Sequence, residues 1–170
     1  IGTIPALVWG DASDKLLLCV HGKMGSKECA DGIARIAREK GYQTISFDLP
    51  QHGERKDEEE RCDIWNGIRD LTTVGNYAFA HWKEISLYAC SLGAYFSLHA
   101  YSMRGFKQCL FQSPILDMEY LIGQMMQWFD VSEERLERKG EVDTPIDVLS
   151  WKYYRYVKEH PVYNWSIPTH

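Results

Sequence analysis

The sequence predicts an α/β fold, in which a mostly parallel sheet carries helices on both faces. Short apolar runs alternate with segments whose apolar residues recur at helical spacing, and turn-forming residues separate them. Strands joined by helices pair in parallel through right-handed crossovers, which place the helices on the two faces of the sheet. Ligands of such sheets bind at the carboxyl ends of the strands, so we look for function in the residues that follow each strand.

The composition excludes several classes of protein. The chain has 170 residues, enough for one domain with its own hydrophobic core. Its 19 lysines and arginines against 24 aspartates and glutamates give a net charge of −5, which offers no basic surface to nucleic acid or to an anionic membrane. No apolar run approaches the roughly 18–20 residues that span a bilayer. We therefore expect a soluble enzyme or binding module without nucleic acid or membrane partners.

The cysteines and the first residues of the chain indicate the cellular compartment in which we expect the protein. The cysteines are odd in number and lack the spacing of zinc ligands; they are Cys19, Cys29, Cys62, Cys90 and Cys109. This usage favours a reducing compartment, the cytoplasm, over a disulfide framework or a structural metal site. No signal peptide is recognisable at Ile1-Gly2-Thr3, and the missing initiator methionine suggests a trimmed or incompletely recorded N-terminus.

Five short strands are expected in the first two thirds of the chain. They occupy apolar or β-branched runs bounded by charged residues, glycine or proline, at residues 4–9, 16–20, 43–47, 84–89 and 107–112. No internal repeat or glycine-serine linker interrupts this region. We therefore expect these strands to form one sheet.

Helices are expected between the strands. The first covers residues 28–40, where apolar residues recur at helical spacing and Gly41 supplies a C-cap. The charged stretch 54–63 is interpreted as a solvated loop or helix start, and two further helices follow over residues 64–82 and 91–103.

The sharpest chemical signal is ACSLG at residues 89–93, between a predicted strand and a predicted helix. A serine at such a turn raises its hydroxyl above the sheet, and the N-terminus of the following helix favours a developing oxyanion. Ser91 could instead serve only as the N-cap of that helix. Cys90, a neighbouring nucleophile candidate, is interpreted as a buried strand-end residue because the larger Leu92 lies two residues after it.

A second signal, HGKMG at residues 21–25, follows the strand at residues 16–20. Glycines let the backbone turn sharply here and aim an amide into the cleft. An oxyanion hole for acyl transfer needs one donor from this loop and one from the residue after the nucleophile. The backbone N–H groups of Lys23 and Leu92 are the predicted pair.

A third signal, DLPQHG at residues 48–53, follows the next strand. We interpret it as a segment that shapes a loop beside the cleft, with His52 a weak candidate for a catalytic base.

In this order, the three motifs resemble those of the α/β-hydrolase superfamily, in particular its small esterase-like and acyl-hydrolase-like members, which carry HGxxG, D-x-P-x-H-G and G-x-S-x-G. This chain has Ala89 in place of the first glycine of the last motif. The resemblance covers residues 4–116. It implies a serine hydrolase that acts on a carboxylic ester or thioester through an acyl-enzyme on Ser91. The amides of Lys23 and Leu92 would form the oxyanion hole, and no metal or organic cofactor would be needed.

The resemblance also implies a division of the chain. Residues 1–116 would form the N-terminal part of the hydrolase core, residues 117–164 a helical cap-like segment, and residues 165–170 the start of a further core strand. Helices are expected near residues 117–129, 132–139 and 145–159. Large side chains of this segment either line an acyl pocket or pack the helices together; they are Met125, Met126, Trp128, Phe129, Trp151, Tyr153 and Tyr154.

A serine nucleophile needs a general base and an acid that orients it, which in this family follow the serine as Asp and then His after two further strands. The sequence stops at His170, about where the first of these strands would begin, so neither role is assigned. His99, His160 and His170 are not predicted to be the base. We expect a fragment of a longer hydrolase or a degenerate domain, and a bare strand edge at residues 107–112 would favour a homo-oligomer.

Two alternatives to catalysis by this chain stay open. One is a non-catalytic, hydrolase-like binding domain that keeps the cleft without the triad, and the other is an inactive fragment of a longer hydrolase. A flavodoxin-like or nucleotide-binding protein is disfavoured. The loop at residues 21–26 contains neither G-x-x-x-x-G-K-[ST] nor G-x-G-x-x-G.

Overall fold

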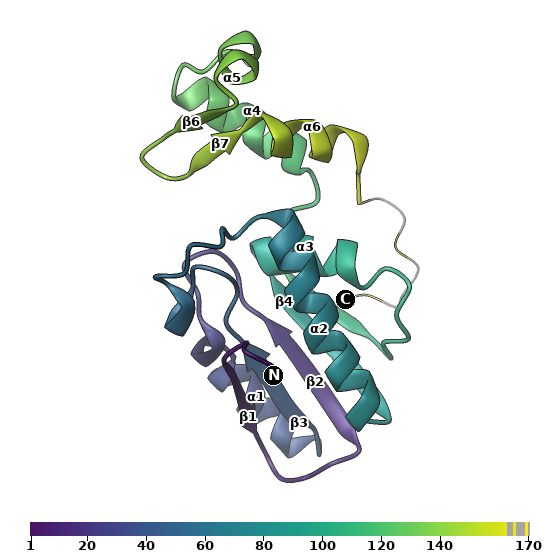
Figure 1. Ribbon diagram of the computed structural model, residues 1–170. Helices are drawn as coiled ribbons and strands as arrows, with labels where there is room; N and C mark the ends of the chain where they lie inside the picture. The colour runs from purple at the N-terminus through teal and green to yellow at the C-terminus, as the bar shows by residue number, and fades with distance from the viewer. Residues whose placement is uncertain (163–164, 166–168, 170) are drawn as a thin grey trace. The chain divides into compact units, whose positions relative to one another are not determined.

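The computed structural model describes residues 1–162, 165 and 169 of the chain. The chain divides into two compact units (Figure 1). Unit 1 comprises Ile1–Ile115 with Asn164–His170, and unit 2 comprises Leu116–Tyr163. The three motifs of the sequence all fall in unit 1.

Unit 1 is built on a five-stranded sheet in the order β1-β3-β2-β4-β5. Its strands are β1 (Ala6–Trp9), β2 (Lys15–Val20), β3 (Gln43–Phe47), β4 (Glu84–Cys90) and β5 (Cys109–Gln112). The strands β2 to β5 pair in parallel, as predicted, whereas β1 is antiparallel to β3. Only residues 10–14 join β1 to β2, too few for a crossover, so the chain reverses direction there.

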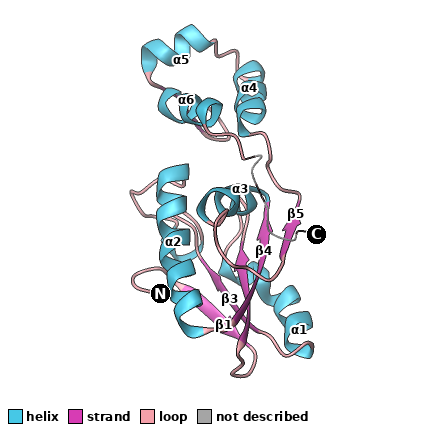
Figure 2. Cartoon of the chain, turned by 90° about the vertical axis from the view of Figure 1, so that its right-hand side faces the viewer, coloured by secondary structure: helices cyan, strands magenta, loops and turns pink. Residues whose placement is uncertain are grey.

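Helices cover both faces of this sheet (Figure 2). Helix α1 (Asp31–Glu39) lies on one face, and α2 (Ile64–His81) and α3 (Ser91–Ala100) lie on the other. The side chains of β2 alternate accordingly: Val20 lies beside the first turn of α3, and Leu17 shares a surface groove with Ala37 of α1. The fold class predicted from the sequence is therefore correct.

The helix ends follow local chemistry. The Gly41 backbone has a φ of 76°, which lets its N–H reach Arg38 O at 2.9 Å and the next N–H reach Ala37 O at 3.0 Å. This is the C-cap expected from the sequence. Helix α2 begins after Asp63, whose carboxylate accepts the N–H of Asn66 at 2.9 Å.

The outer edge of β5 is not bare. Thr169 forms a parallel bridge with Cys109, and its hydroxyl accepts the Trp165 indole N–H at 2.8 Å. The Trp165 ring packs edge-on against Phe111, with centroids 5.6 Å apart. The chain itself therefore occupies part of this edge. Of the strand expected at residues 165–170, all other positions lie outside the described residues.

Unit 2 combines three helices with a short hairpin. Its elements are α4 (Met118–Trp128), α5 (Glu133–Lys139), β6 (Glu141–Asp143), β7 (Val148–Ser150) and α6 (Trp151–Glu159). Met126 and Tyr154 are buried in this unit, whereas Trp128 is 61% exposed.

The expected helix near residues 145–159 is wrong at its N-terminal end. Residues 148–150 pair antiparallel with β6, and Ser150 caps α6 by accepting the N–H of Tyr153. The turn before them is held by Thr144, whose N–H and hydroxyl both donate to Asp147 O. Among the described residues, no helix combines the length and the apolar character that crossing a bilayer requires.

Candidate functional site

Ser91 lies at the junction where β4 passes directly into α3. Its backbone φ is 47°, in the left-handed region, which costs an L-residue roughly 1–2 kcal/mol. The N-cap position of α3 falls on Cys90, with no capping bond from its side chain. Ser91 is thus the strained first residue of the helix, and the alternative that it merely caps the helix does not describe this junction.

Two glycines bring the first two motifs into contact. A Cβ atom on Gly93 would overlap the carbonyl oxygen of His21 and would lie 2.9 Å from Val20 Cγ1. A Cβ atom on Gly22 would lie 3.1 Å from Ser91 Cβ and 3.2 Å from Cys90 O. The absence of a side chain at both positions lets the loop after β2 pack directly against the Ser91 turn.

A cavity of about 330 Å³ opens at this contact. Ser91 and Lys23 both line it, together with Gly22, Cys90 and Gln112. The second predicted donor, Leu92, follows Ser91 in the first turn of α3, where backbone N–H groups have no acceptor within the helix. The structure therefore places Ser91 and Lys23 around one opening, whereas Leu92 adjoins Ser91 in the chain and does not itself line the cavity.

Cys90 differs from its interpretation as a buried strand-end residue. It is only partly buried and lines the same cavity as Ser91. The alternation of side chains along β4 explains this, because Cys90 shares a face with Tyr88, another lining residue, whose hydroxyl donates to Gln112 Oε1.

His21 joins two loops of the site. The Leu49 N–H donates to His21 Nε2 at 3.1 Å, and Nδ1 lies 2.8 Å from Gly22 O. Because Nε2 accepts a hydrogen bond, the neutral ring carries its proton on Nδ1, which donates to Gly22 O. Burial of the ring, which is only 5% exposed, lowers the pKa of His21 and so favours its neutral form.

The third motif shapes the neighbouring loop. The fully buried Asp48 carboxylate accepts the Lys27 N–H at 2.7 Å, the Lys27 ammonium at 2.9 Å and the Glu54 N–H at 3.0 Å. Gly53, with a φ of 53°, lies so close to this carboxylate that a Cβ atom would overlap it. Asp48 therefore fixes the loop after β3 against the 3₁₀ helix Lys27–Ala30.

The other histidines discussed from the sequence lie elsewhere. His52 Nδ1 bonds to Pro50 O at 2.8 Å, and this residue is not among those that line the Ser91 cavity. The His99 ring packs against Tyr95 within α3, and His160 Nδ1 bonds to Tyr156 O at the end of α6. His170 lies outside the described residues.

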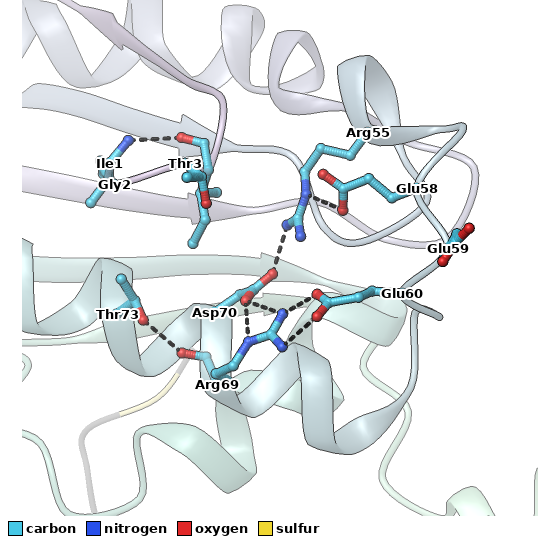
Figure 3. A pocket seen from close by; sticks show the side chains of 11 residues that line it. Ile1, Gly2, Thr3, Arg55, Glu58, Glu59, Glu60, Arg69, Asp70 and Thr73 are labelled. Atoms are coloured by element: carbon cyan, nitrogen blue, oxygen red, sulfur yellow. Dashed lines mark hydrogen bonds and ion pairs between the residues drawn. The ribbon is translucent and has the colours of Figure 1, made fainter.

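A second cavity in unit 1, of about 500 Å³, is lined by charged side chains near the N-terminus and α2 (Figure 3). Arg55 Nη1 donates to Asp70 Oδ2 at 2.6 Å, and Arg69 pairs with both Asp70 and Glu60. These charges neutralise one another, and none of the lining residues is an activated nucleophile. The cavity at Ser91, although smaller, is therefore the candidate catalytic site.

The described residues contain no group of three or more His, Cys, Asp or Glu side chains that could hold a metal ion. The five cysteines are all free thiols. The Ser91 cavity is lined by the Ser91 hydroxyl, by the free thiol of Cys90 and by Tyr88.

No family model and no curated protein matches this chain, but solved structures do. Est1E from Butyrivibrio proteoclasticus with bound ferulic acid gives a TM-score of 0.73 at 17% identity, over 98% of this chain and 72% of that one. Mouse alpha/beta hydrolase domain-containing protein 10 gives 0.69 at 15% identity, over 96% and 70%. A monoacylglycerol lipase from Paleococcus ferrophilus gives 0.65 at 14% identity, over 98% and 75%. The chain has the α/β-hydrolase fold.

Proposed function

We propose that the chain is a serine hydrolase acting on a carboxylic ester or thioester. The Ser91 oxygen attacks the carbonyl carbon, the alcohol or thiol leaves with a proton, and water then releases the acid from the acyl-enzyme. The observation that carries the proposal is the strained backbone of Ser91, with φ 47°, at a strand-to-helix junction that opens into a cavity. Strain of this kind is retained where it serves a function.

The backbone supports the second element of the proposal, an oxyanion hole. The N–H groups of Lys23 and Leu92 are the proposed donors, one from the loop after β2 and one from the first turn of α3. Gly22 and Gly93 allow these two segments to approach each other closely. Fixed backbone donors of this kind stabilise the negative charge that develops on the carbonyl oxygen.

The similar structures support hydrolysis as the reaction class. The structure from Paleococcus ferrophilus is named a monoacylglycerol lipase, and the one from Butyrivibrio proteoclasticus holds ferulic acid. The free thiols support a cytoplasmic location for the proposed enzyme.

Acylation also requires a general base to accept the Ser91 proton. Among the described histidines, His21 is engaged by Leu49 N–H and Gly22 O, and His52 lies beside it. We therefore assign neither histidine as the base; the family's order of Ser, acid and His would place both groups later in the chain than Ser91.

Labelling with a fluorophosphonate tests the proposal. The full-length protein is incubated with the probe and digested, and the labelled peptide is identified by mass spectrometry. We expect the adduct on Ser91, none in Ser91→Ala, and an unchanged labelling site in the matched neighbour variant Cys90→Ala. A folded wild-type protein that takes no label on Ser91 would show that this residue is not a catalytic nucleophile. Hydrolysis of matched ester and thioester substrates then separates the two classes.

A further inference from the structure

We infer that His21 is a positioning residue whose neutral ring aims the Lys23 N–H as an oxyanion donor. This inference rests on the proposed function of Ser91. His21 lies two positions before Lys23 in the chain. Its side chain acts on the Lys23 N–H through the peptide unit between Gly22 and Lys23.

The first step concerns the peptide unit that joins Gly22 to Lys23. Its carbonyl oxygen accepts two hydrogen bonds, from His21 Nδ1–H at 2.8 Å and from Gly25 N–H at 3.1 Å. In a planar trans peptide the C=O and the following N–H point in opposite directions. Fixing the Gly22 oxygen with two donors therefore fixes the direction of the Lys23 N–H.

The second step concerns the ring of His21, which is held from its other nitrogen. The Leu49 N–H donates to Nε2 at 3.1 Å, from the loop that follows β3. A Cβ atom on Gly25 would lie 3.1 Å from both His21 Cβ and Nδ1, so the loop closes tightly over the ring. The orientation of the Gly22–Lys23 peptide is thereby linked to a segment 28 residues away.

The third step concerns charge. His52 and Asp48 face the ring from the loop after β3, and Glu28 faces it from the 3₁₀ helix; the His52 ring lies 5.2 Å from that of His21 between centroids. The two carboxylates favour the protonated ring, whereas burial and His52 disfavour it, and burial is the largest effect. The result is a pKa below the usual value for histidine.

Protonation would break the arrangement. A second proton on the ring can only add to Nε2, where it would face the Leu49 N–H, so that two donors would meet. The ring would lose this bond, and with it the orientation that lets Nδ1–H hold the Gly22 oxygen. Acid should therefore slow acylation of Ser91 through His21, in addition to its effect on the general base.

Three variants separate the two bonds of the ring. Asparagine in His21→Asn can still donate to Gly22 O from the position of Nδ1, whereas glutamine in His21→Gln reaches only toward Leu49 N–H. His21→Ala retains neither bond. We expect His21→Asn to keep its fluorophosphonate labelling rate within about tenfold of wild type. Loss of one oxyanion donor costs about 10²–10³, so His21→Gln and His21→Ala should fall by about a hundredfold.

The pH profile gives a readout that a merely structural role would not move. The labelling rate of every variant should fall at low pH as the general base is protonated; this decrease is called the acid limb. Protonation of His21 adds to it only in the wild-type protein, so the wild-type acid limb should be steeper than that of His21→Asn. Circular dichroism and thermal unfolding check that each variant is folded. If His21→Ala does not fold, the Asn and Gln variants decide: equal labelling rates and equal acid limbs in those two would overturn the inference.

An NMR experiment keeps this inference separate from the proposed function. Long-range ¹H–¹⁵N spectra of the labelled protein should show the His21 proton on Nδ1, and the Lys23 amide should shift when His21 titrates. A proton on Nε2, or a Lys23 amide whose chemical shift stays constant while His21 titrates, would refute the positioning role even if Ser91 is labelled normally. An unlabelled wild-type Ser91 with the expected spectra would refute the catalytic role alone.

Discussion

Gly93 lies against the carbonyl oxygen of His21, so close that a single added carbon would overlap that oxygen. The contact joins the residue two positions after Ser91 to the first residue of the loop after β2. Two motifs some 70 residues apart in the sequence therefore meet at one cavity. They can approach this closely because Gly93 and Gly22 have no side chains.

Replacing this glycine should disturb both stability and the site. Gly93→Ala forces the first turn of α3 away from the end of β2, and we expect a loss of about 2 kcal/mol in the free energy of unfolding, as for overpacking in a core. Ser91 labelling should fall with it. Urea unfolding measures the first effect and fluorophosphonate labelling the second.

The matched control is Gly123→Ala in α4, where no heavy atom beyond the helix's own backbone and the chain neighbours lies within 4 Å of the new carbon. This change should stabilise unit 2 by about 0.5–1 kcal/mol, the ordinary helix propensity of alanine over glycine. A Gly93→Ala protein as stable as wild type would contradict the close contact.

The strain at Ser91 predicts a reversal of the usual helix preference. Ser91→Gly and Ser91→Ala both remove the hydroxyl, but only glycine adopts a φ of 47° without steric cost. We expect Ser91→Gly to be about 1 kcal/mol more stable than Ser91→Ala, although alanine is normally the better helix former. Chemical denaturation of the two variants checks this order; an Ala variant more stable than the Gly variant would argue against backbone strain at this turn.

His21 predicts a dependence of stability on pH. Burial lowers its pKa in the folded state below 6.5, so the unfolded chain binds a proton there more readily. The free energy of unfolding should therefore decrease as the pH falls below about 6.5, until the folded-state pKa is passed.

His21→Asn should flatten that part of the pH profile, whatever its effect on stability at neutral pH. His160→Asn removes an exposed histidine of unit 2 and serves as the control, with the wild-type slope retained. Urea unfolding at a series of pH values gives both slopes. Identical slopes in wild type and His21→Asn would exclude His21 as the titrating group.

The ion pairs of the larger cavity predict a difference between buried and exposed partners (Figure 3). The side chains of Arg55 and Asp70 are 6% and 4% exposed, so Asp70→Asn removes the buried partner of a buried guanidinium, which keeps only its ion pair with the more exposed Glu58. We expect a loss of about 3 kcal/mol in the free energy of unfolding. Glu60→Gln removes a carboxylate that is 52% exposed and screened by water, so the loss for this variant should be clearly smaller. Similar losses for the two variants would contradict this distinction.

Some of the predicted elements are determined by residues close to them in the sequence, and others by contacts with distant parts of the chain. The Gly41 cap and the strand from Gln43 depend on neighbouring residues, so the sequence pattern identifies both. The direction of β1 follows from its short connection to β2 and is stabilised by pairing with β3, more than 30 residues away, and the short hairpin at residues 141–150 depends on a turn held by Thr144. Neither is visible in hydrophobic periodicity, which is why β1 was expected in a mostly parallel sheet and β7 in a helix.

By itself, the sequence determined the fold class and pointed to Ser91, Lys23 and Leu92, because strand and helix periodicities and turn residues are local properties. Only the tertiary structure decided that Ser91 and Lys23 line the same cavity. Whether Ser91 caps a helix or bears strain depends on the backbone conformation at the junction of β4 and α3, where the φ of Ser91 is 47°. The protonation state of His21 depends on the Leu49 N–H, which long-range folding alone brings to its ring.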